Sequence, residues 1–389
     1  MGIILGFYYH IPCFVSVDGK IGMPSFQGLF VDSLATKVDH LYCFLHVQKV
    51  DGSIDYWLTS SNITIVSLGP DSPAYIKTFF PSRFVSRNSN KFIALCDKII
   101  VRGPSPLLHQ FRKIASPDKI IYFIIGSYKE GLKYIPDKWY RRYAIRLLLG
   151  YIDNKQEKVL RGSKILVNSQ ANKTKYSKIA RKVGLVYTTT LKDTDFFIRE
   201  DTCRSETIKL MFIGRLDRAK GLYELTRAFQ IINKEHNKVE LHFVGWENNP
   251  TVPVKREIEA WANTNNLGEK IIFHGKKTAG PELLEYYREG DIYVLPSYHE
   301  GFPRTIWEAM ASSLPVITTN VDTIPDFLTH KENAYLIPPH NQSALVNAIR
   351  EVIADKNLRQ RLIQGGLQRA KEVTLEVQAN KLIKFISDE

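Results

Sequence analysis

The sequence has few cysteines and no long apolar segment. Its four cysteines among 389 residues, Cys13, Cys43, Cys96 and Cys203, show no C-x-x-C spacing, which argues against a zinc site or a redox pair. A disulfide framework is not expected in a chain of this size, so a reducing cytosol is the predicted compartment. No apolar run approaches the roughly 20 residues that a membrane-spanning helix needs. The apolar start at 1–9 lacks a basic n-region and a cleavage site, and is predicted to be a core strand rather than a signal peptide.

Acidic residues are also in short supply. Lys and Arg number 53 against 40 Asp and Glu, which gives a formal net charge of +13. Such an excess favours an anionic partner: nucleic acid, acidic lipid or a phosphorylated substrate. A nucleic-acid partner is not predicted, because no recognised binding module and no basic motif interleaved with aromatic residues is present.

One stretch, 137–161, mixes cations with large apolar side chains. A helix here has the composition of an interfacial helix that lies in the headgroup plane of an anionic membrane surface. This interpretation predicts peripheral attachment to the inner face of the cytoplasmic membrane. The alternative is that the apolar residues pack in the N-terminal domain and the cations coat it. The interleaved apolar residues are Trp139, Tyr140, Tyr143, Ile145, Leu147, Leu148, Leu149 and Tyr151.

The length and the pattern predict two α/β domains. A chain of 389 residues is about twice the usual size of one domain. Short runs rich in β-branched and aromatic residues alternate with amphipathic segments, which is typical of parallel sheets. Strands are expected at 3–9, 41–47, 98–102, 120–125 and 164–168 in the first half, and at 208–213, 240–244, 271–274, 292–295, 315–318 and 334–337 in the second.

A polar stretch at 185–206 separates the two halves and is predicted to connect them. The N-terminal domain is then 1–200 and the C-terminal domain 205–369, with a last helix at about 370–389 that packs back on the first domain. Two Rossmann-like domains of this kind bind ligands at the carboxyl ends of their strands. The Asp-Thr-Asp triplet at 193–195 lacks the strand context of a metal site, so no metal is predicted there.

The most informative segment is 296–311, with the sequence PSYHEGFPRTIWEAMA. The strand at 292–295 leads into a turn, and a helix is expected to start near Pro303, since proline is favoured at the first helical position. Free backbone N–H groups from Gly301 to Thr305 would suit a diphosphate. Gly301 lets an anionic ligand come close to the backbone.

Two carboxylates frame this helix start. Glu300 precedes the helix and Glu308 lies more than one turn inside it, so they can contact opposite ends of one extended ligand. The segment resembles the E-x7-E motif of family 4 of the GT-B glycosyltransferases. The resemblance implies that Glu300 contacts the hydroxyls of a donor sugar and that Glu308 contacts the ribose. The implied donor-binding residues around them are Gly301, Phe302, Pro303 and Thr305.

A second stretch, FIGRLDRAKG at 212–221, resembles the G-R-L-x-x-x-K-G stretch of the same family. There the Arg and the Lys hold the donor phosphates, which implies that role for Arg215 and Lys220, beside Gly214. The departing nucleoside diphosphate gathers negative charge, and preorganised cations lower the barrier. With these cations and the helix start to neutralise the diphosphate, no metal and no other cofactor is expected.

Two further strand ends resemble glycine turns of the family. They are VGW at 244–246 and FHGKK at 273–277. The second adds Gly275 and Lys276 as expected donor contacts, at the position of a base or a ribose.

The first half should hold the acceptor. A glycine-bearing loop often follows the first strand in this family, and DGKIGM at 18–23, with Gly19 and Gly22, could fill that role. A plain connecting loop is the alternative. A helix is expected to follow near Ser25.

Two further residues are candidates on the acceptor side. Arg102 ends a strand and is a candidate contact for an acceptor phosphate, and His10 lies just past the first expected strand. Many relatives place a His after a middle strand, near the reacting carbon. The matching strand at 120–125 ends in Gly126 and Ser127 instead. Whether any His serves the reacting centre stays open.

The resemblance implies a GT-B fold and a retaining transfer of a hexose-type sugar from a nucleotide-sugar donor, with a UDP-sugar favoured. The acceptor would be a glycan or a polyisoprenoid-linked glycan in bacterial surface polysaccharide assembly. The implied mechanism is front-face: the leaving phosphate helps deprotonate the acceptor hydroxyl. Two alternatives are a GT-B sugar-nucleotide epimerase, which needs no acceptor, and a catalytically silent GT-B subunit that scaffolds a partner.

Overall fold

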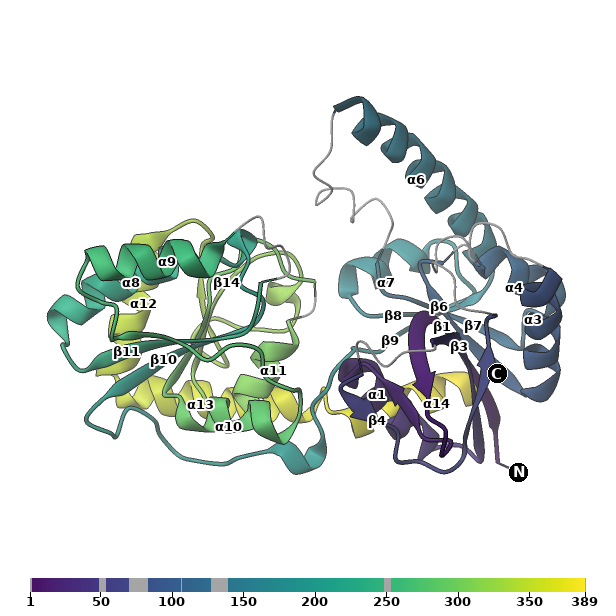
Figure 1. Ribbon diagram of the computed structural model, residues 1–389, viewed down its shortest axis with the longest axis horizontal. Coiled ribbons are helices and arrows are strands. Elements are labelled where there is room, and N and C mark those ends of the chain that lie inside the picture. The colour runs from purple at the N-terminus through teal and green to yellow at the C-terminus, as the bar shows by residue number, and fades with distance from the viewer. Residues whose placement is uncertain are drawn as a thin grey trace. The chain divides into compact units, whose positions relative to one another are not determined.

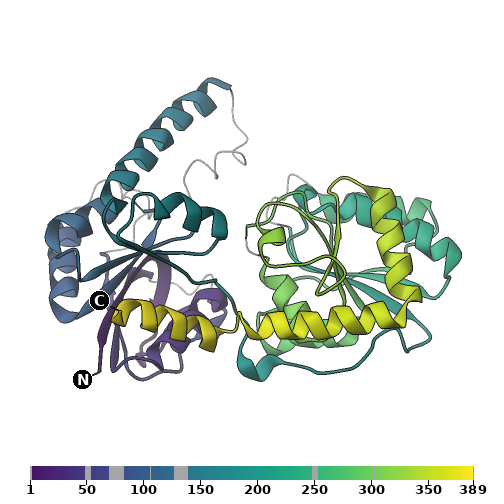
Figure 2. The same cartoon turned by 180° about the vertical axis from the view of Figure 1, so that it is seen from behind.

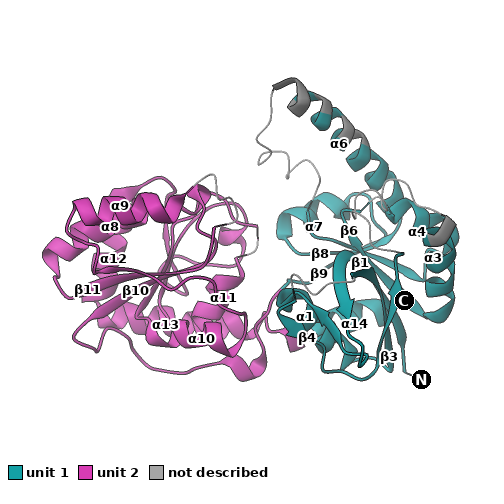
Figure 3. Cartoon of the chain, in the orientation of Figure 1, with its two compact units in different colours: residues 1–188, 378–389 teal, residues 189–377 magenta. Residues whose placement is uncertain are grey.

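The fold is seen in a computed structural model. It describes residues 2–48, 54–69, 83–105, 107–126, 139–247, 253–301 and 303–388. The chain divides into two compact units, residues 1–188 with 378–389 and residues 189–377 (Figure 3). Each unit is an α/β structure with its own sheet, and each is described by itself.

The first unit is built on parallel strands. Runs such as the fully buried IIYFI of β7 suit a parallel sheet that is covered on both faces. The strand order reverses between β1 and β6, which makes this the switch point of the sheet. The parallel strands are, in spatial order, β5 (Ile63–Ser67), β3 (His40–Gln48), β1 (Ile4–Val15), β6 (Lys98–Gly103), β7 (Ile120–Ile124), β8 (Lys164–Val167) and β9 (Lys182–Leu185).

Strand β1 is longer than expected. After a register shift it continues and pairs antiparallel with β2 (Ile21–Met23), which in turn pairs with β4 (Tyr56–Trp57). His10 therefore lies inside β1 rather than after it, and Gly22 lies in β2 rather than in a loop. A Cβ atom on Gly22 would come within 2.7 Å of Ile54, so close packing explains this glycine.

Helices cover both faces of this sheet. Neighbouring residues of a strand point to opposite faces, and in β1 the ring of Phe7 contacts Phe30 of α1 (Ser25–Ala35) while that of Tyr8 contacts Phe111 of α4 (Leu108–Ile114). The core beneath α4 also includes buried residues of α3 (Arg83–Leu95), of the end of α6 (Trp139–Leu160) and of α7 (Gln170–Ser177). On the other face, Phe385 of α14 (Leu375–Ser387) lies against Gly184.

The second unit is a six-stranded parallel sheet in the described residues. The expected strands 208–213 and 292–295 are confirmed at both ends as β10 and β13. Between these two strands the strand order reverses. The spatial order is β12 (Ile271–Phe273), β11 (Val239–Val244), β10 (Ile208–Ile213), β13 (Ile292–Leu295), β14 (Val316–Thr319) and β15 (Tyr335–Ile337).

The helices of the second unit lie in two layers. Figure 1 shows α8 and α9 on one side of the sheet and α10 and α13 on the other. Figure 2, seen from the opposite side, shows α13 running along the sheet. Among all described helices, none combines the length and the apolar character needed to cross a membrane. The bounds are α8 (Leu222–Glu235), α9 (Val254–Thr264), α10 (Pro281–Glu289), α11 (Arg304–Ala311), α12 (Gln342–Ala354) and α13 (Lys356–Lys371), with short 3-10 turns η2 (Asp193–Asp195), η3 (Arg218–Lys220) and η4 (Ile324–Asp326).

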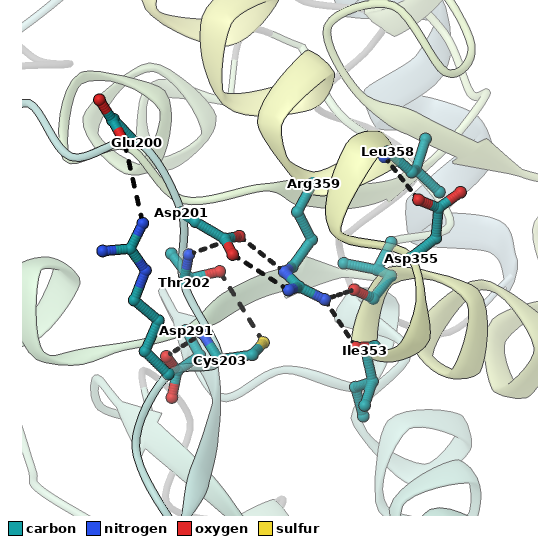
Figure 4. Close-up of polar contacts among 11 residues, drawn as sticks. Glu200, Asp201, Thr202, Cys203, Asp291, Ile353, Asp355, Leu358 and Arg359 are labelled. Carbon is teal, nitrogen blue, oxygen red and sulfur yellow. Dashed lines mark hydrogen bonds and ion pairs between the residues drawn. The ribbon is translucent and has the colours of Figure 1, made fainter.

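A buried ion pair fixes the segment that leads into β10 (Figure 4). Nε of Arg359, on α13, lies 2.8 Å from Oδ1 of Asp201, and the guanidinium also donates to the carbonyl of Ile353. Next to it, Asp291 accepts the backbone N–H of Cys203 at 2.7 Å. Both side chains of the ion pair are more than nine-tenths buried, so loss of either would leave an uncompensated buried charge.

Candidate active site

The candidate donor site lies at the switch point between β10 and β13. In open α/β sheets, ligands bind outside the carboxyl ends of the strands at such a point. Lys220 lies in the loop after β10 and Glu300 in the loop after β13. The two loops contact each other through a 2.8 Å hydrogen bond from the Tyr298 N–H to the Ala219 carbonyl.

Lys220 and Glu300 form an ion pair at this point. The Lys220 Nζ lies 2.5 Å from Oε1 of Glu300, and the hydroxyl of Ser297 donates to the same oxygen at 2.6 Å. The two charged side chains are 16% and 8% exposed, so their interaction is screened less than that of a surface pair. The structure thus brings together two residues that the sequence predicted for different parts of one ligand.

Gly221 makes this approach possible. Its φ of 66° lies in the left-handed region, which glycine adopts without steric cost. A Cβ atom here would lie 2.1 Å from the carbonyl oxygen of Pro296. The loop that carries Lys220 could not pack against the β13 loop with any other residue at this position.

Three glycines follow three neighbouring strands. The N–H of Gly245 donates to the carbonyl of Gly275 at 2.9 Å, and a Cβ atom on Gly245 would overlap the carbonyl oxygen of Gly214. The expected residues Gly214 and Gly275 therefore belong to one continuous edge, and between them lies Gly245 of the VGW turn, which the sequence also indicated. Lys276 extends this edge, with its Nζ 5.4 Å from the ring centre of Trp246.

Arg215 is the second predicted phosphate ligand. It follows Gly214 and is exposed. It makes no hydrogen bond or ion pair with the residues that the structure describes. Its guanidinium is therefore available to a ligand, whereas Lys220 is already engaged by a carboxylate.

Helix α11 starts at Arg304, in agreement with the helix start expected near Pro303. Pro303 has ψ of 90°, an extended conformation, and is the N-cap rather than the first helical residue. The first turn contains Thr305. The N–H of Ile306 donates to the Pro303 carbonyl at 3.0 Å, and the N–H groups before it have no partner within the helix. The space where Gly301 would carry a Cβ atom is open, in keeping with a close backbone approach. Phe302 lies outside the described residues.

Glu308 is buried inside α11 and holds two hydroxyl groups. Thr190 donates to Oε1 at 2.6 Å and Tyr287 of α10 donates to Oε2 at 2.9 Å. Burial raises the pKa of Glu308, and the hydrogen bond from Thr190 and the charge of Arg304 oppose that rise. Each oxygen keeps a lone pair for a further donor. Thr190 and Tyr287 were not predicted, because they meet Glu308 only in the folded unit.

In the first unit the structure brings Arg102 and His10 together at the β1–β6 switch point. The guanidinium of Arg102 lies 4.1 Å from the ring centre of Tyr9 and donates to Gln27. Burial and then the charge of Arg102 lower the pKa of His10. Gly19 lies apart from them in the β1–β2 turn, with φ of 81°.

The described residues contain no group of three or more His, Cys, Asp or Glu side chains arranged to hold a metal ion.

Comparison with known proteins gives the following matches. Residues 193–369 match the family model of the glycosyl transferases group 1. The chain is 28% identical over 161 residues to the capsular polysaccharide biosynthesis glycosyltransferase CapM of Staphylococcus aureus. The aligned stretch covers 41% of this chain and 40% of CapM. It is 23% identical over 353 residues, 79% of each chain, to an uncharacterized glycosyltransferase of Methanocaldococcus jannaschii. The chain spans less than half the length of seven of the eight curated relatives compared in detail.

The fold matches over the whole chain. The crystal structure of Anabaena HepE in complex with UDP superimposes with a TM-score of 0.69 at 15% identity, over 99% of both chains. The predicted GT-B fold of two Rossmann-like units is thereby confirmed.

Proposed function

We propose that the chain, whose residues 193–369 match the group 1 glycosyltransferase family, is a retaining enzyme that transfers a hexose-type sugar from a nucleotide-sugar donor to a glycan or polyisoprenoid-linked acceptor. The observation that carries this proposal is the contact of Lys220 with Glu300 at the switch point of the second unit. In the proposal Lys220 binds the donor diphosphate and Glu300 binds hydroxyls of the sugar.

The reaction breaks the bond between the anomeric carbon and the diphosphate oxygen. A bond from the acceptor hydroxyl oxygen to the same carbon forms on the same face, and the hydroxyl proton passes to the departing phosphate. Negative charge grows on that phosphate. Lys220, Arg215 and the N–H groups at the start of α11 stabilise it, because they are held in position before the reaction. Glu300 orients the sugar and forms no covalent bond.

The nucleoside would lie along the glycine edge. Glu308 accepts the ribose hydroxyls, while Gly214, Gly275 and Lys276 contact the ribose or the base. HepE, which shares the fold, was crystallised with UDP, so UDP is the first nucleotide to test. CapM, the relative from Staphylococcus aureus, is named for capsular polysaccharide biosynthesis, which supports a role in surface polysaccharide assembly.

The first unit would bind the acceptor, and its charge supports an anionic one. The first unit, residues 1–188 and 378–389, contains 29 Lys and Arg against 14 Asp and Glu, whereas residues 189–377 contain 24 against 26. The whole basic excess of the chain therefore lies in the first unit. A diphosphate-linked glycan at a membrane surface suits this distribution.

Helix α6 is the proposed contact with that surface, on the inner face of the cytoplasmic membrane. Val159 and Leu160 at its end are buried, whereas Tyr143 and Leu147 are 63% and 59% exposed. These two are four residues apart and so share one face of the helix. Exposed Arg146 lies between them in sequence. Lys138 and the side chains of Trp139, Tyr140, Leu148 and Tyr151 lie outside the described part of the chain.

A product assay tests the proposal against its alternatives. The purified chain is incubated with UDP-sugars, with and without glycan or lipid-linked acceptors, and the products are examined by NMR. Acceptor-dependent release of UDP with an unchanged anomeric configuration supports a retaining transferase. A converted sugar nucleotide formed without acceptor would indicate an epimerase instead. Nucleotide binding without any product would indicate a silent subunit.

A further inference from the structure

The end of β14 and the loop after it hold the loop that carries Glu300. Their side chains bond to backbone groups at the end of β13 and in the loop after it. The contacts are Thr318 Oγ1 to the Leu295 carbonyl at 2.9 Å, Thr319 Oγ1 to the Ser297 carbonyl at 2.5 Å, the Glu300 N–H to Asp322 Oδ2 at 2.8 Å, and Thr323 Oγ1 to the Gly301 carbonyl.

Asp322 makes the contact nearest to the proposed chemistry. Its Oδ2 accepts the backbone N–H of Glu300 and also lies 3.5 Å from Nδ1 of His299. The backbone of Glu300 is thus held by Asp322, while its carboxylate is held by Lys220 and Ser297. These two sets of contacts together orient the Glu300 side chain.

Asp322 holds this position in a strained conformation. Its φ is 47°, in the left-handed region that residues other than glycine seldom adopt. Strained residues of this kind persist where the surrounding structure fixes them, and they cluster at functional sites. Glycine would adopt the same backbone without strain, but it offers no oxygen to the Glu300 N–H. The carboxylate is therefore the feature that Asp322 supplies and that a glycine at this position would lack.

We propose that Asp322 is a positioning residue that holds Glu300 in the orientation needed to bind the donor sugar. This inference rests on the proposed function, in which Glu300 binds hydroxyls of the donor sugar. Loosening the Glu300 backbone should weaken recognition of the sugar and slow turnover. It should leave binding of the bare nucleotide intact, because that depends on Lys220 and Glu308.

Two substitutions separate positioning from a purely structural role. Asp322→Gly removes the acceptor oxygen and relieves the strain, whereas Asp322→Asn keeps an acceptor oxygen and tolerates the left-handed backbone. The readouts are UDP release from the UDP-sugar that most stabilises the wild type, the Kd values for that sugar nucleotide and for UDP, and the melting temperature. We expect Asp322→Gly to lower kcat by about 10–100-fold, as small misplacements do. Its Kd for UDP should change by less than about twofold and its melting temperature should not fall, and Asp322→Asn should recover most of kcat.

A matched control is Asn266→Gly. Asn266 has φ of 57°, is exposed and lies after α9, outside the site, so this change relieves similar strain and should leave kcat unchanged. Wild-type kcat in Asp322→Gly would overturn the inference, and so would a loss of kcat matched by an equal loss of UDP affinity. A wild-type chain that binds no nucleoside diphosphate would overturn the proposed function itself.

Discussion

The ammonium nitrogen of Lys220 lies 2.5 Å from the Oε1 of Glu300, although 80 positions separate the two residues in the sequence. The pair joins the loops on the two sides of the β10–β13 switch point. A donor phosphate that binds Lys220 would share that ammonium with Glu300, the residue proposed to read the sugar. In the proposed function, recognition of the phosphate and recognition of the sugar would therefore be coupled through one ion pair.

The two glutamates should respond differently to loss of charge. Glu308→Gln should weaken binding of bare UDP and of the full donor alike, because Glu308 is proposed to hold the ribose. Glu300→Gln should spare bare UDP but slow turnover by about 10²–10³-fold, the typical effect of losing one preorganised contact. Calorimetric titration of each variant with UDP and with the full donor distinguishes the two roles. Equal losses of UDP affinity in the two variants would show that the roles are misassigned.

The buried carboxyl of Glu308 predicts opposite pH effects on binding and on folding. Burial raises the pKa of Glu308 above its usual value, so UDP binding should weaken as the pH falls through that raised pKa and the carboxylate is protonated. The free energy of unfolding depends on pH in the opposite direction. The stability contributed by the protonated form is present below the unfolded pKa of about 4.3 and is lost as the pH rises through the folded pKa.

Glu308→Gln cannot titrate and should lose both pH dependences at this site. The neighbouring charges, Arg304 and Asp195, remain in the variant, so the difference between the two proteins isolates Glu308. Binding titrations and urea unfolding from pH 4 to pH 8 measure it. Parallel pH profiles for wild type and variant would refute the assignment.

The ion pair of Arg359 and Asp201 should stabilise the second unit without affecting donor binding. Asp201→Asn leaves the guanidinium uncompensated, which costs about 3–5 kcal/mol for buried pairs. Although burial acts to raise it, the hydrogen bond and charge of Arg359 lower the pKa of Asp201. The stability it contributes is therefore present above the unfolded pKa of about 3.9 and is lost as the pH falls through the folded pKa.

Urea unfolding of Asp201→Asn at neutral and acidic pH tests this. Asp326→Asn, at an exposed position on η4, is the control and should change stability by less than about 0.5 kcal/mol. An Asp201→Asn protein as stable as the control, or one whose folded form binds UDP more weakly, would contradict this interpretation.

Attachment through α6 should depend on lipid charge and on two exposed side chains. Each basic residue near an anionic surface contributes about 1 kcal/mol, so co-sedimentation with anionic vesicles should exceed that with neutral ones and should fall at high salt. Tyr143→Ser combined with Leu147→Ser should reduce binding further. Val17→Ser, at a fully exposed position in the same unit, should not. Equal binding to anionic and neutral vesicles, or no binding to either, would favour a soluble acceptor.

The strands that the sequence revealed are those with buried apolar runs. β10 and β13 are confirmed to the residue, because burial on both faces leaves a continuous hydrophobic signal. β9 was not predicted. It is a half-buried edge strand containing Gly184, and its pairing with β8 identifies it only in the folded unit.

Some residues of the candidate site could likewise be predicted from the sequence, and others could not. Lys220, Glu300 and Glu308 lie in motifs with a characteristic local spacing, so the sequence made them candidates. Thr190 and Asp322 lie in other segments and reach the motif only through tertiary contacts. The threonine run at 188–190 reads as a polar connector, and no local pattern predicts that Thr190 donates to Glu308.

The most direct test of the central claim is calorimetric titration of the full chain with UDP. We expect UDP to bind saturably at one site, and a UDP-sugar to displace it. Lys220→Ala should weaken that binding and should lower turnover by about 10²–10³-fold, when measured well below its melting temperature. Lys234→Ala, which removes the same charge from an exposed position on α8, should behave as wild type. UDP binding and turnover that are equal in Lys220→Ala and Lys234→Ala would contradict the claim that the Lys220–Glu300 pair forms the donor site.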